Sequence, residues 1–112
     1  MAKDLQVSVL LDYYGALLSE KQQTLVELYY NQDFSLSEIA ESEGITRQGA
    51  SDGIKRAESY LRELEEKLGV VSHAEKTAGY VKEIITAADE IKPDEKADFI
   101  KKTAKKLEFW QR

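Results

Sequence analysis

Residues Ser35–Arg56, SLSEIAESEGITRQGASDGIKR, decide the fold, because they encode two helices joined by a tight turn. Ser35 and Glu38 form an S-x-x-E capping box, in which the hydroxyl and the carboxylate satisfy amide groups at a helix start. Gly44 stands where that helix has to end, since glycine adopts the left-handed conformation without a Cβ clash. Thr46 is a good N-cap, so a second helix is predicted directly after it. This order of signals is typical of a helix-turn-helix motif.

The start of the second motif helix carries the candidate binding residues. In a helix-turn-helix, that end of the second helix enters the major groove of DNA. The polar residues predicted there are Arg47, Gln48, Ser51, Asp52, Lys55 and Arg56.

Two glycines, Gly49 and Gly53, interrupt this predicted helix one turn apart. Each costs roughly 1 kcal/mol relative to alanine, so the start of the helix is expected to be soft. The alternative interpretation is a smooth patch where another helix or a backbone approaches closely. Either interpretation weakens autonomous, sequence-specific DNA binding.

Apolar residues at helical spacing predict further helices on both sides of the motif. One helix begins near Leu5 and is expected to face the core with the apolar residues Val9, Leu10, Tyr13, Tyr14, Leu17 and Leu18. Another follows an S-x-x-Q capping box at Ser19 and ends near Asn31. The second motif helix continues far beyond the turn, because apolar residues from Ala50 to Leu68 alternate spacings of four and three, as in a heptad seam. The seam is either core of this chain or, at its far end, part of a homodimer.

The C-terminal third predicts a pair of helices. Gly69 closes the long helix, and Ser72 opens a helix that runs to about Glu90. Pro93 and Asp94 suit the first turn of a final helix. Strand signals are absent, so the expected fold is all-α, a compact bundle of about six helices. Residues 1–71 form the helix-turn-helix domain with its N-terminal helix, and residues 72–112 a C-terminal helical pair packed on it as one structural domain.

Composition excludes several classes of function. The chain has 112 residues, one proline and no cysteine, so disulfides and cysteine-ligated metals are excluded. The lone His73 has no second histidine with which to build a metal site or a nucleophile–base pair, and we expect no enzyme, metal or cofactor. No apolar run is long enough to span a membrane, which makes the cytoplasm the expected location.

The charge distribution is unusual for a nucleic-acid-binding protein. The formal net charge is −5, although affinity for nucleic acid usually rests on Lys and Arg that displace counterions from phosphates. Residues 1–71 are the acidic part, with a net charge of −6. The dense basic cluster lies near the C-terminus and consists of Lys101, Lys102, Lys105 and Lys106. It is either a solvated face at a helix C-terminus or a contact for phosphate backbone, structured RNA or an acidic partner.

Two stretches of the chain resemble a known family. DYYGALLSEKQQTLVELYYNQDFSLSEIAESEGITRQ, residues Asp12–Gln48, and IKRAESYLRELEEKL, residues Ile54–Leu68, are similar to the bacterial YlxM-like helix-turn-helix proteins. Those proteins resemble region 4 of sigma factors, and their genes lie beside genes of the signal recognition particle. The resemblance implies a three-helical DNA-binding core, related to the winged helix but without strands, and a link to the targeting pathway. The similarity to region 4 of sigma factors further implies that Arg47, Gln48 and Asp52 face base edges, with Lys55 and Arg56 near the phosphate backbone.

The residues and the resemblance leave two hypotheses of different classes. The first is a regulatory nucleic-acid-binding module that binds DNA, or less readily RNA, as a homodimer with two weak half-sites. The second is a non-catalytic adaptor of the signal recognition particle pathway. In that case the helix-turn-helix is a scaffold and the last helix is the contact surface. Neither hypothesis includes a membrane or a small-molecule ligand.

Overall fold

The structure, a computed structural model, describes residues 3–91 and 95–111, with side chains up to residue 108. Within these residues it contains six α-helices, two short 3₁₀ helices and no strand, which confirms the predicted all-α class. The chain divides into two compact units, Met1–Gly69 and Val70–Arg112. None of the described helices combines the length and the apolarity needed to cross a membrane.

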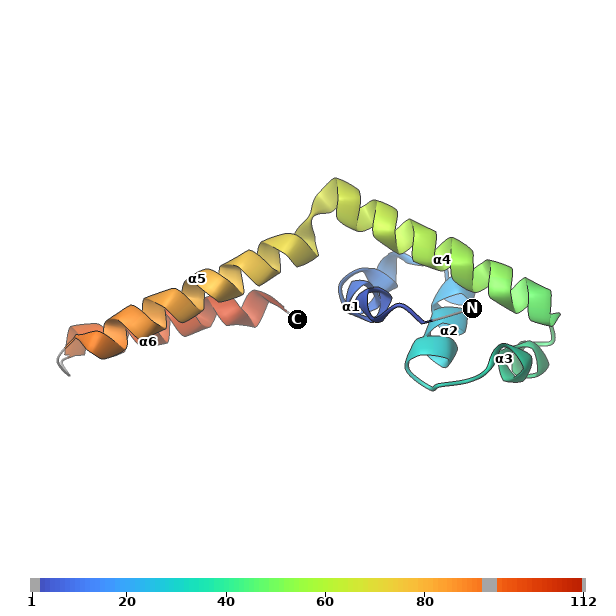
Figure 1. The fold of residues 1–112 in the computed structure, drawn as a ribbon, viewed down its shortest axis with the longest axis horizontal. Helices are drawn as coiled ribbons and strands as arrows, with labels where there is room; N and C mark the ends of the chain where they lie inside the picture. The colour runs from blue at the N-terminus through green and yellow to red at the C-terminus, as the bar shows by residue number, and fades with distance from the viewer. Residues whose placement is uncertain (1–2, 92–94, 112) are drawn as a thin grey trace. The chain divides into compact units, whose positions relative to one another are not determined.

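The first unit consists of four α-helices and one 3₁₀ helix (Figure 1). These are α1 (Leu5–Tyr14), η1 (Gly15–Leu17), α2 (Glu20–Tyr30), α3 (Leu36–Glu43) and α4 (Arg47–Leu68). Helices α1, α2 and α3 all pack against α4, the longest helix of the chain. The long helix is therefore the structural axis of this unit.

Side-chain caps start α2, α3 and α4 where the sequence predicts. Ser19 and Ser35 both form complete capping boxes, with Gln22 and Glu38 at the third helical position. Because the Ser35 backbone amide donates to the Glu38 carboxylate, the pKa of Glu38 is lowered from its usual value. The caps satisfy amide groups that have no partner inside their own helix.

The predicted seam of α4 forms the core of the first unit. Ala50, Ile54, Ala57 and Leu61 are completely buried, which is what an intramolecular core requires. Leu68, at the far end of the same seam, is 58% exposed. The seam is thus internal over most of its length and reaches solvent only near the end of α4.

Gly53 allows α2 and α4 to approach closely. A Cβ atom added at Gly53 would lie 2.5 Å from Cδ1 of Leu25, a distance that real Cβ atoms essentially never show. Leu25 is itself buried together with Tyr29 and Ile39 in the cluster beneath the motif. Of the two interpretations of this glycine, the structure shows the close approach of another helix.

The first helix differs in part from its prediction. It begins at Leu5 as expected, but its last part is the 3₁₀ turn η1. Val9 and Leu17 were expected on the core-facing stripe and are instead 40% and 56% exposed. Tightening the helix to three residues per turn rotates the side chains that follow, so a uniform 3.6-residue spacing misplaces Leu17.

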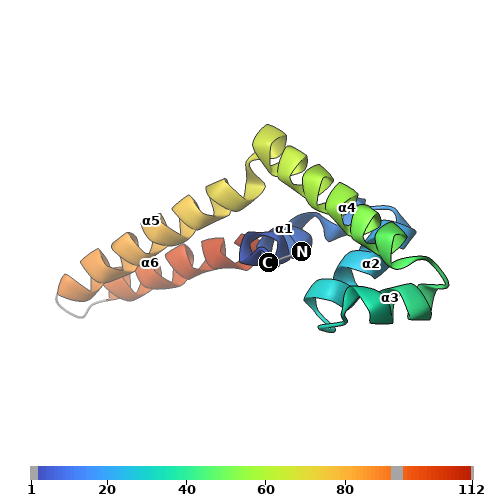
Figure 2. The same ribbon diagram turned by 45° about the vertical axis from the view of Figure 1, so that its right-hand side comes forward.

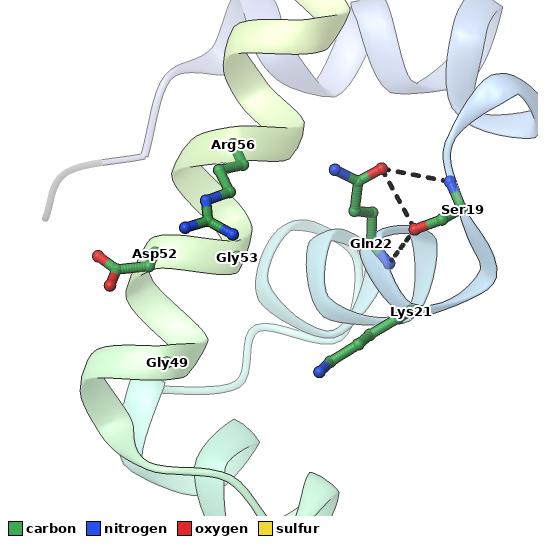
Figure 3. A pocket seen from close by; sticks show the side chains of 7 residues that line it. All are labelled: Ser19, Lys21, Gln22, Gly49, Asp52, Gly53 and Arg56. Carbon is green, nitrogen blue, oxygen red and sulfur yellow. Dashed lines mark hydrogen bonds between the residues drawn. The ribbon is translucent and has the colours of Figure 1, made fainter.

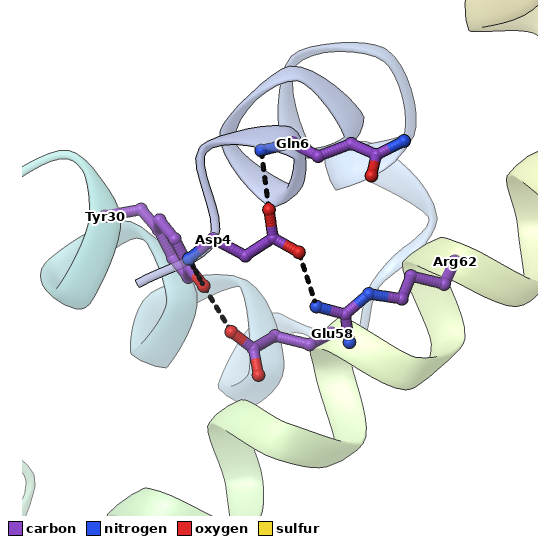
Figure 4. Close-up of polar contacts among 5 residues, drawn as sticks. All are labelled: Asp4, Gln6, Tyr30, Glu58 and Arg62. Carbon is purple, nitrogen blue, oxygen red and sulfur yellow. Dashed lines mark hydrogen bonds and ion pairs between the residues drawn. The ribbon is translucent and has the colours of Figure 1, made fainter. Parts of the chain in front are cut away.

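A polar network ties the N-terminal segment to α2 and α4 (Figure 4). The Tyr30 hydroxyl donates to the carboxylate of the buried Glu58 and accepts from the Asp4 backbone amide at 3.3 Å. The Arg62 guanidinium donates to Asp4 at 3.0 Å and lowers the pKa of that carboxyl. The hydrogen bonds give the buried carboxylate of Glu58 the partner that it requires.

The second unit is a helical hairpin, in which α5 (Val70–Glu90) and α6 (Glu95–Lys105) lie side by side and η2 (Lys106–Gln111) follows (Figure 2). Gly69 closes α4 in the left-handed conformation, as predicted. Helix α5 then starts at Val70, two residues before the predicted start at Ser72, because the single left-handed residue suffices to end one helix. The expectations for Pro93 and Asp94 lie outside the described residues.

Small side chains line the contact between the two helices of the hairpin. The buried residues are Val71, Ala74, Val81 and Ala88 on α5, and Ala97 and Ala104 on α6. The Lys101 ammonium group lies 2.6 Å from an Asp89 carboxylate oxygen and adds an ion pair between α5 and α6. The packing of this hairpin on the first unit stays a prediction.

Candidate nucleic-acid interface

Helices α3 and α4 and the turn between them form the predicted motif. Gly44 ends α3 in the left-handed region, with φ of 67°, and its amide donates to Ala40. The Thr46 hydroxyl accepts from the Gly49 amide at 2.9 Å and fixes the first turn of α4. Ile45 packs against the cluster that includes Ile39 and Ala50, so the two helices are held at a fixed angle.

The start of α4 presents most of the predicted contact residues to solvent. Arg47, Gln48, Asp52, Lys55 and Arg56 are all exposed. Ser51 was predicted among the exposed residues at this end, but only 9% of it is exposed. The reason is that its side of α4 faces the interior of the unit. The spacing of four residues places Ser51 between Arg47 and Lys55 on a stripe that turns toward α3.

A first hollow of about 440 Å³ lies between α3 and α4. It is lined by Leu36, the first residue of α3, and by Arg47, Gln48, Ser51 and Lys55 of α4. Two cations and the positive end of the α3 dipole therefore border the same depression. No carboxylate is among its lining residues.

A second hollow, of about 530 Å³, lies between the start of α2 and α4 (Figure 3). Ser19, Lys21 and Gln22 line it from α2, and Gly49, Asp52, Gly53 and Arg56 line it from α4. Figure 3 shows the Asp52 carboxylate directed away from α2. The Lys21 and Arg56 side chains border the hollow from its two sides.

Sequence reasoning missed Lys21, because it lies 26 positions before Arg47 and belongs to a different helix. No local sequence pattern indicates Lys21; only the tight packing of α2 on Gly53 reveals it. This contact brings the first turn of α2 beside the first turns of α4.

The cations of the first unit fall into two groups. Lys3, Arg62 and Lys67 each form an ion pair with a carboxylate. The remaining ones are Lys21, Arg47, Lys55 and Arg56, and among the described residues none of these forms an ion pair. All of them line the two hollows at the start of α4. An acidic unit thus keeps its unneutralised positive charge on one face.

Gln48 and Asp52 hold each other on that face. The Gln48 side-chain amide donates to a carboxylate oxygen of Asp52 at 2.9 Å, one turn further along α4. The Gln48 carbonyl and the second Asp52 oxygen stay available to a ligand. The pair therefore offers acceptors between cations, which is the kind of pattern that reads base edges.

The predicted basic cluster near the C-terminus lies in the other unit, and its lysines differ in their ion pairing. Lys101 is paired with Asp89, which raises the pKa of its ammonium group. Lys102, Lys105 and Lys106 are exposed and form no ion pair with any residue that the structure describes. In residues 3–91 and 95–111, no group of three or more acidic or histidine side chains is arranged to hold a metal ion.

The fold and the geometry define the class of protein. A capped three-helix core that presents the start of a long second motif helix is a helix-turn-helix protein. A family model described as "Putative helix-turn-helix protein, YlxM / p13 like" matches residues 1–103. The chain belongs to this family, UPF0122.

Relatives of the same family cover most of the chain. The UPF0122 protein of Desulforamulus reducens is 43% identical over 98 residues, which are 88% of this chain and 84% of that protein. A UPF0122 protein of Clostridium kluyveri is 40% identical over 102 residues, 91% of this chain and 92% of that protein. That of Halalkalibacterium halodurans is 44% identical over 87 residues, 78% of this chain and 80% of that protein.

Proposed function

We propose that this chain is a non-catalytic, DNA-binding regulatory protein of the cytoplasm that acts as a homodimer. The start of α4 enters the major groove, with Arg47, Gln48 and Asp52 toward base edges. Lys55 and Arg56 contact phosphates on either side, and Lys21 joins them from α2. Ser51 takes part only where a ligand reaches the bottom of the first hollow.

The observation that carries this proposal is the position of the unpaired cations. In a unit whose net charge is negative, random placement would scatter such cations, and neighbouring carboxylates would neutralise many of them. Here Lys21, Arg47, Lys55 and Arg56 surround one helix end, and the paired cations lie elsewhere. Phosphates gain most from cations that no protein carboxylate already neutralises.

The negative net charge of the chain determines the affinity for DNA that we expect. The whole chain carries −5, so its net charge opposes the approach to DNA and binding depends on short-range contacts. With three phosphate contacts per copy, from Lys21, Lys55 and Arg56, the affinity of one copy should fall roughly 40-fold between about 50 and 200 mM salt. Two copies on one duplex offset the weakness of each half-site.

The experiment is an electrophoretic-shift titration of the full chain at both salt concentrations. The probes are duplex promoter DNA and signal recognition particle RNA, each with the wild type and two variants. Arg47→Ala should weaken DNA binding. Lys67→Gln is the matched control, because it removes one positive charge from the far end of the same helix. Equal effects of both variants, or no binding of DNA at low salt, would contradict the proposal.

A second candidate function rests on the exposed lysines of the hairpin. Lys102, Lys105 and Lys106 suit the phosphates of structured RNA or an acidic protein, as an adaptor of the signal recognition particle pathway requires. In that case a Lys102/Lys105/Lys106→Gln variant loses binding to the particle RNA or its protein components. Arg47→Ala is silent under this alternative, whereas the proposal above predicts the reverse pattern.

A further inference from the structure

Gln48 and Asp52 form the outermost part of α4 at its start. Asp52 lies two positions after Ala50, which is completely buried, so a rotation of about 200° around the helix axis directs Asp52 away from the core. Gln48 lies one turn earlier on the same side. Gly49 and Gly53, the next residue after each, have no side chain that could shield the pair. We call Gln48 and Asp52 the polar ridge.

The hydrogen bond within the polar ridge determines which groups the ridge presents. The Gln48 side-chain amide donates to one carboxylate oxygen of Asp52 at 2.9 Å, which uses one of the two amide hydrogens. The Gln48 carbonyl oxygen and the other Asp52 oxygen remain, and both of them accept hydrogen bonds. The bond also restricts the rotation of the Asp52 side chain. The polar ridge is therefore an oriented pair of acceptors with a negative charge.

A carboxylate at this place needs a donor on the DNA. Phosphates repel a carboxylate, and Lys55 and Arg56, three and four positions after Asp52, are the residues that suit phosphates. In the major groove, the donors are the N4 amino group of cytosine and the N6 amino group of adenine. The Asp52 carboxylate is therefore accommodated where it faces one of these two amino groups.

The two amino groups differ in their neighbours. In an A·T pair, N6 of adenine lies between two acceptors, N7 of the same base and O4 of thymine. In a G·C pair, N4 of cytosine has an acceptor on one side, O6 of guanine, and the C5–H edge of cytosine on the other. A pair of acceptors is thus repelled from both sides in the A·T pair and from one side in the G·C pair. The polar ridge is complementary to cytosine.

The hydrogen bond between Gln48 and Asp52 also disfavours adenine. A free glutamine reads adenine because it accepts from N6 and donates to N7 at the same time. In the polar ridge, the Gln48 amide nitrogen that would donate to N7 is bonded to the Asp52 carboxylate. The same approach to adenine would place that carboxylate near N7, and two acceptors repel each other.

We propose that the polar ridge selects a cytosine, whose N4 amino group donates a hydrogen bond to the Asp52 carboxylate while Gln48 holds that carboxylate in place. Asp52 is then the residue that determines the specificity, and Gln48 is its positioning residue. The inference rests on the proposed contact of α4 with DNA. It adds the base that one position of each half-site contains.

The first experiment selects bound duplexes from a randomised DNA library with the full chain at about 50 mM salt. The wild type should enrich duplexes that have a G·C pair at one fixed position. Asp52→Asn should shift this position toward A·T, because asparagine presents the donor and the acceptor that adenine matches. Glu66→Gln is the matched control, since it removes the same charge from the far end of α4, and it should keep the cytosine. Circular dichroism checks that the variants keep their helices.

The second experiment tests the amino group itself and can be done with the wild type alone. In the selected duplex, N4-methylcytosine replaces the selected cytosine, which removes the hydrogen that faces the major groove and keeps the base pair. Affinity measured by fluorescence anisotropy should fall about 5-fold or more. The same modification at a G·C pair outside the half-site is the control. Gln48→Ala should discriminate less between the two duplexes, because the Asp52 side chain is then free to rotate.

The outcomes separate this inference from the proposed function. Enrichment without a preferred cytosine would overturn the inference and leave the DNA contact standing. A cytosine preference that Asp52→Asn retains would do the same, and so would equal binding of the duplex with N4-methylcytosine in the half-site. A wild type that retains no duplex of the library at low salt would overturn both the inference and the proposed function.

Discussion

At the residue scale, Tyr30 is the polar group that most clearly ties the first unit together. Its hydroxyl is shared between the Asp4 amide and the buried Glu58 carboxylate, which connects the N-terminal segment, α2 and α4. Burial, and then the hydrogen bond to Glu58, raises the pKa of Tyr30 to about 12. The folded state therefore favours the protonated hydroxyl of Tyr30, and ionisation of this hydroxyl destabilises the folded state.

Replacing Tyr30 by phenylalanine should lower the free energy of unfolding by about 1–3 kcal/mol, since Glu58 would lose its buried partner. The pH dependence should change as well. In the wild type the unfolded chain loses this proton near pH 10 and the folded chain near pH 12, so stability falls between these values. In Tyr30→Phe that contribution is absent. Urea unfolding of both proteins at pH values from about 8 to about 11 measures the difference.

Glu27→Gln serves as the reference for that experiment, because Glu27 is an exposed carboxylate on the same helix and has no part in the network. If Tyr30→Phe were as stable as the wild type at neutral pH, the hydrogen bond to Glu58 would have no net stabilising effect. An unchanged loss of stability above pH 10 would assign the alkaline titration to another group.

At the element scale, the packing of α2 on α4 depends on the missing side chain of Gly53. Alanine at this position would gain roughly 1 kcal/mol of helix propensity but force its Cβ against Leu25, whose side chain is buried. Overpacking a core typically costs about 1–3 kcal/mol, so we expect Gly53→Ala to destabilise the first unit. Thermal unfolding followed by circular dichroism measures the shift.

Gly79→Ala provides the contrast within the same chain. Gly79 also lies inside a helix, but a Cβ there would have no atom within 4 Å, so only the propensity gain remains. This variant should stabilise its helix by roughly 1 kcal/mol. If both substitutions were stabilising, Leu25 would have room to move and the close approach of α2 would not be tight.

The sequence predicts local features of these elements better than their relative positions. The caps at Ser19, Ser35 and Thr46 and the stop at Gly44 were all predictable, because each depends on residues within one turn. The exposure of Leu17 and the burial of Ser51 were not, because a 3₁₀ turn and a neighbouring helix decide them. The start of α5 was also missed, because the single left-handed residue Gly69 already ends α4.

In the candidate site, too, local features could be predicted and features that depend on tertiary contacts could not. Arg47, Gln48, Asp52, Lys55 and Arg56 could be predicted as an exposed group, since the spacing on one helix and its cap define their face. Lys21 could not, because only the approach of α2 to Gly53 brings it there. The pairing of the other cations with carboxylates, which leaves this face positive, also depends on tertiary contacts.

At the scale of the whole molecule, the proposed homodimer makes a prediction about the length of DNA. A duplex of about 12 base pairs offers one half-site, and one of about 30 base pairs offers two at a spacing of about one helical turn. A dimer that engages both should bind the longer duplex on the order of 100-fold more tightly, because the second contact is intramolecular.

Fluorescence anisotropy of the wild type and Arg47→Ala with both duplexes measures this advantage. Arg47→Ala should weaken binding to both lengths. A wild type that is dimeric but gains nothing from length would show that its two motifs do not engage one duplex together. In that case the DNA contact of each motif would have to suffice by itself.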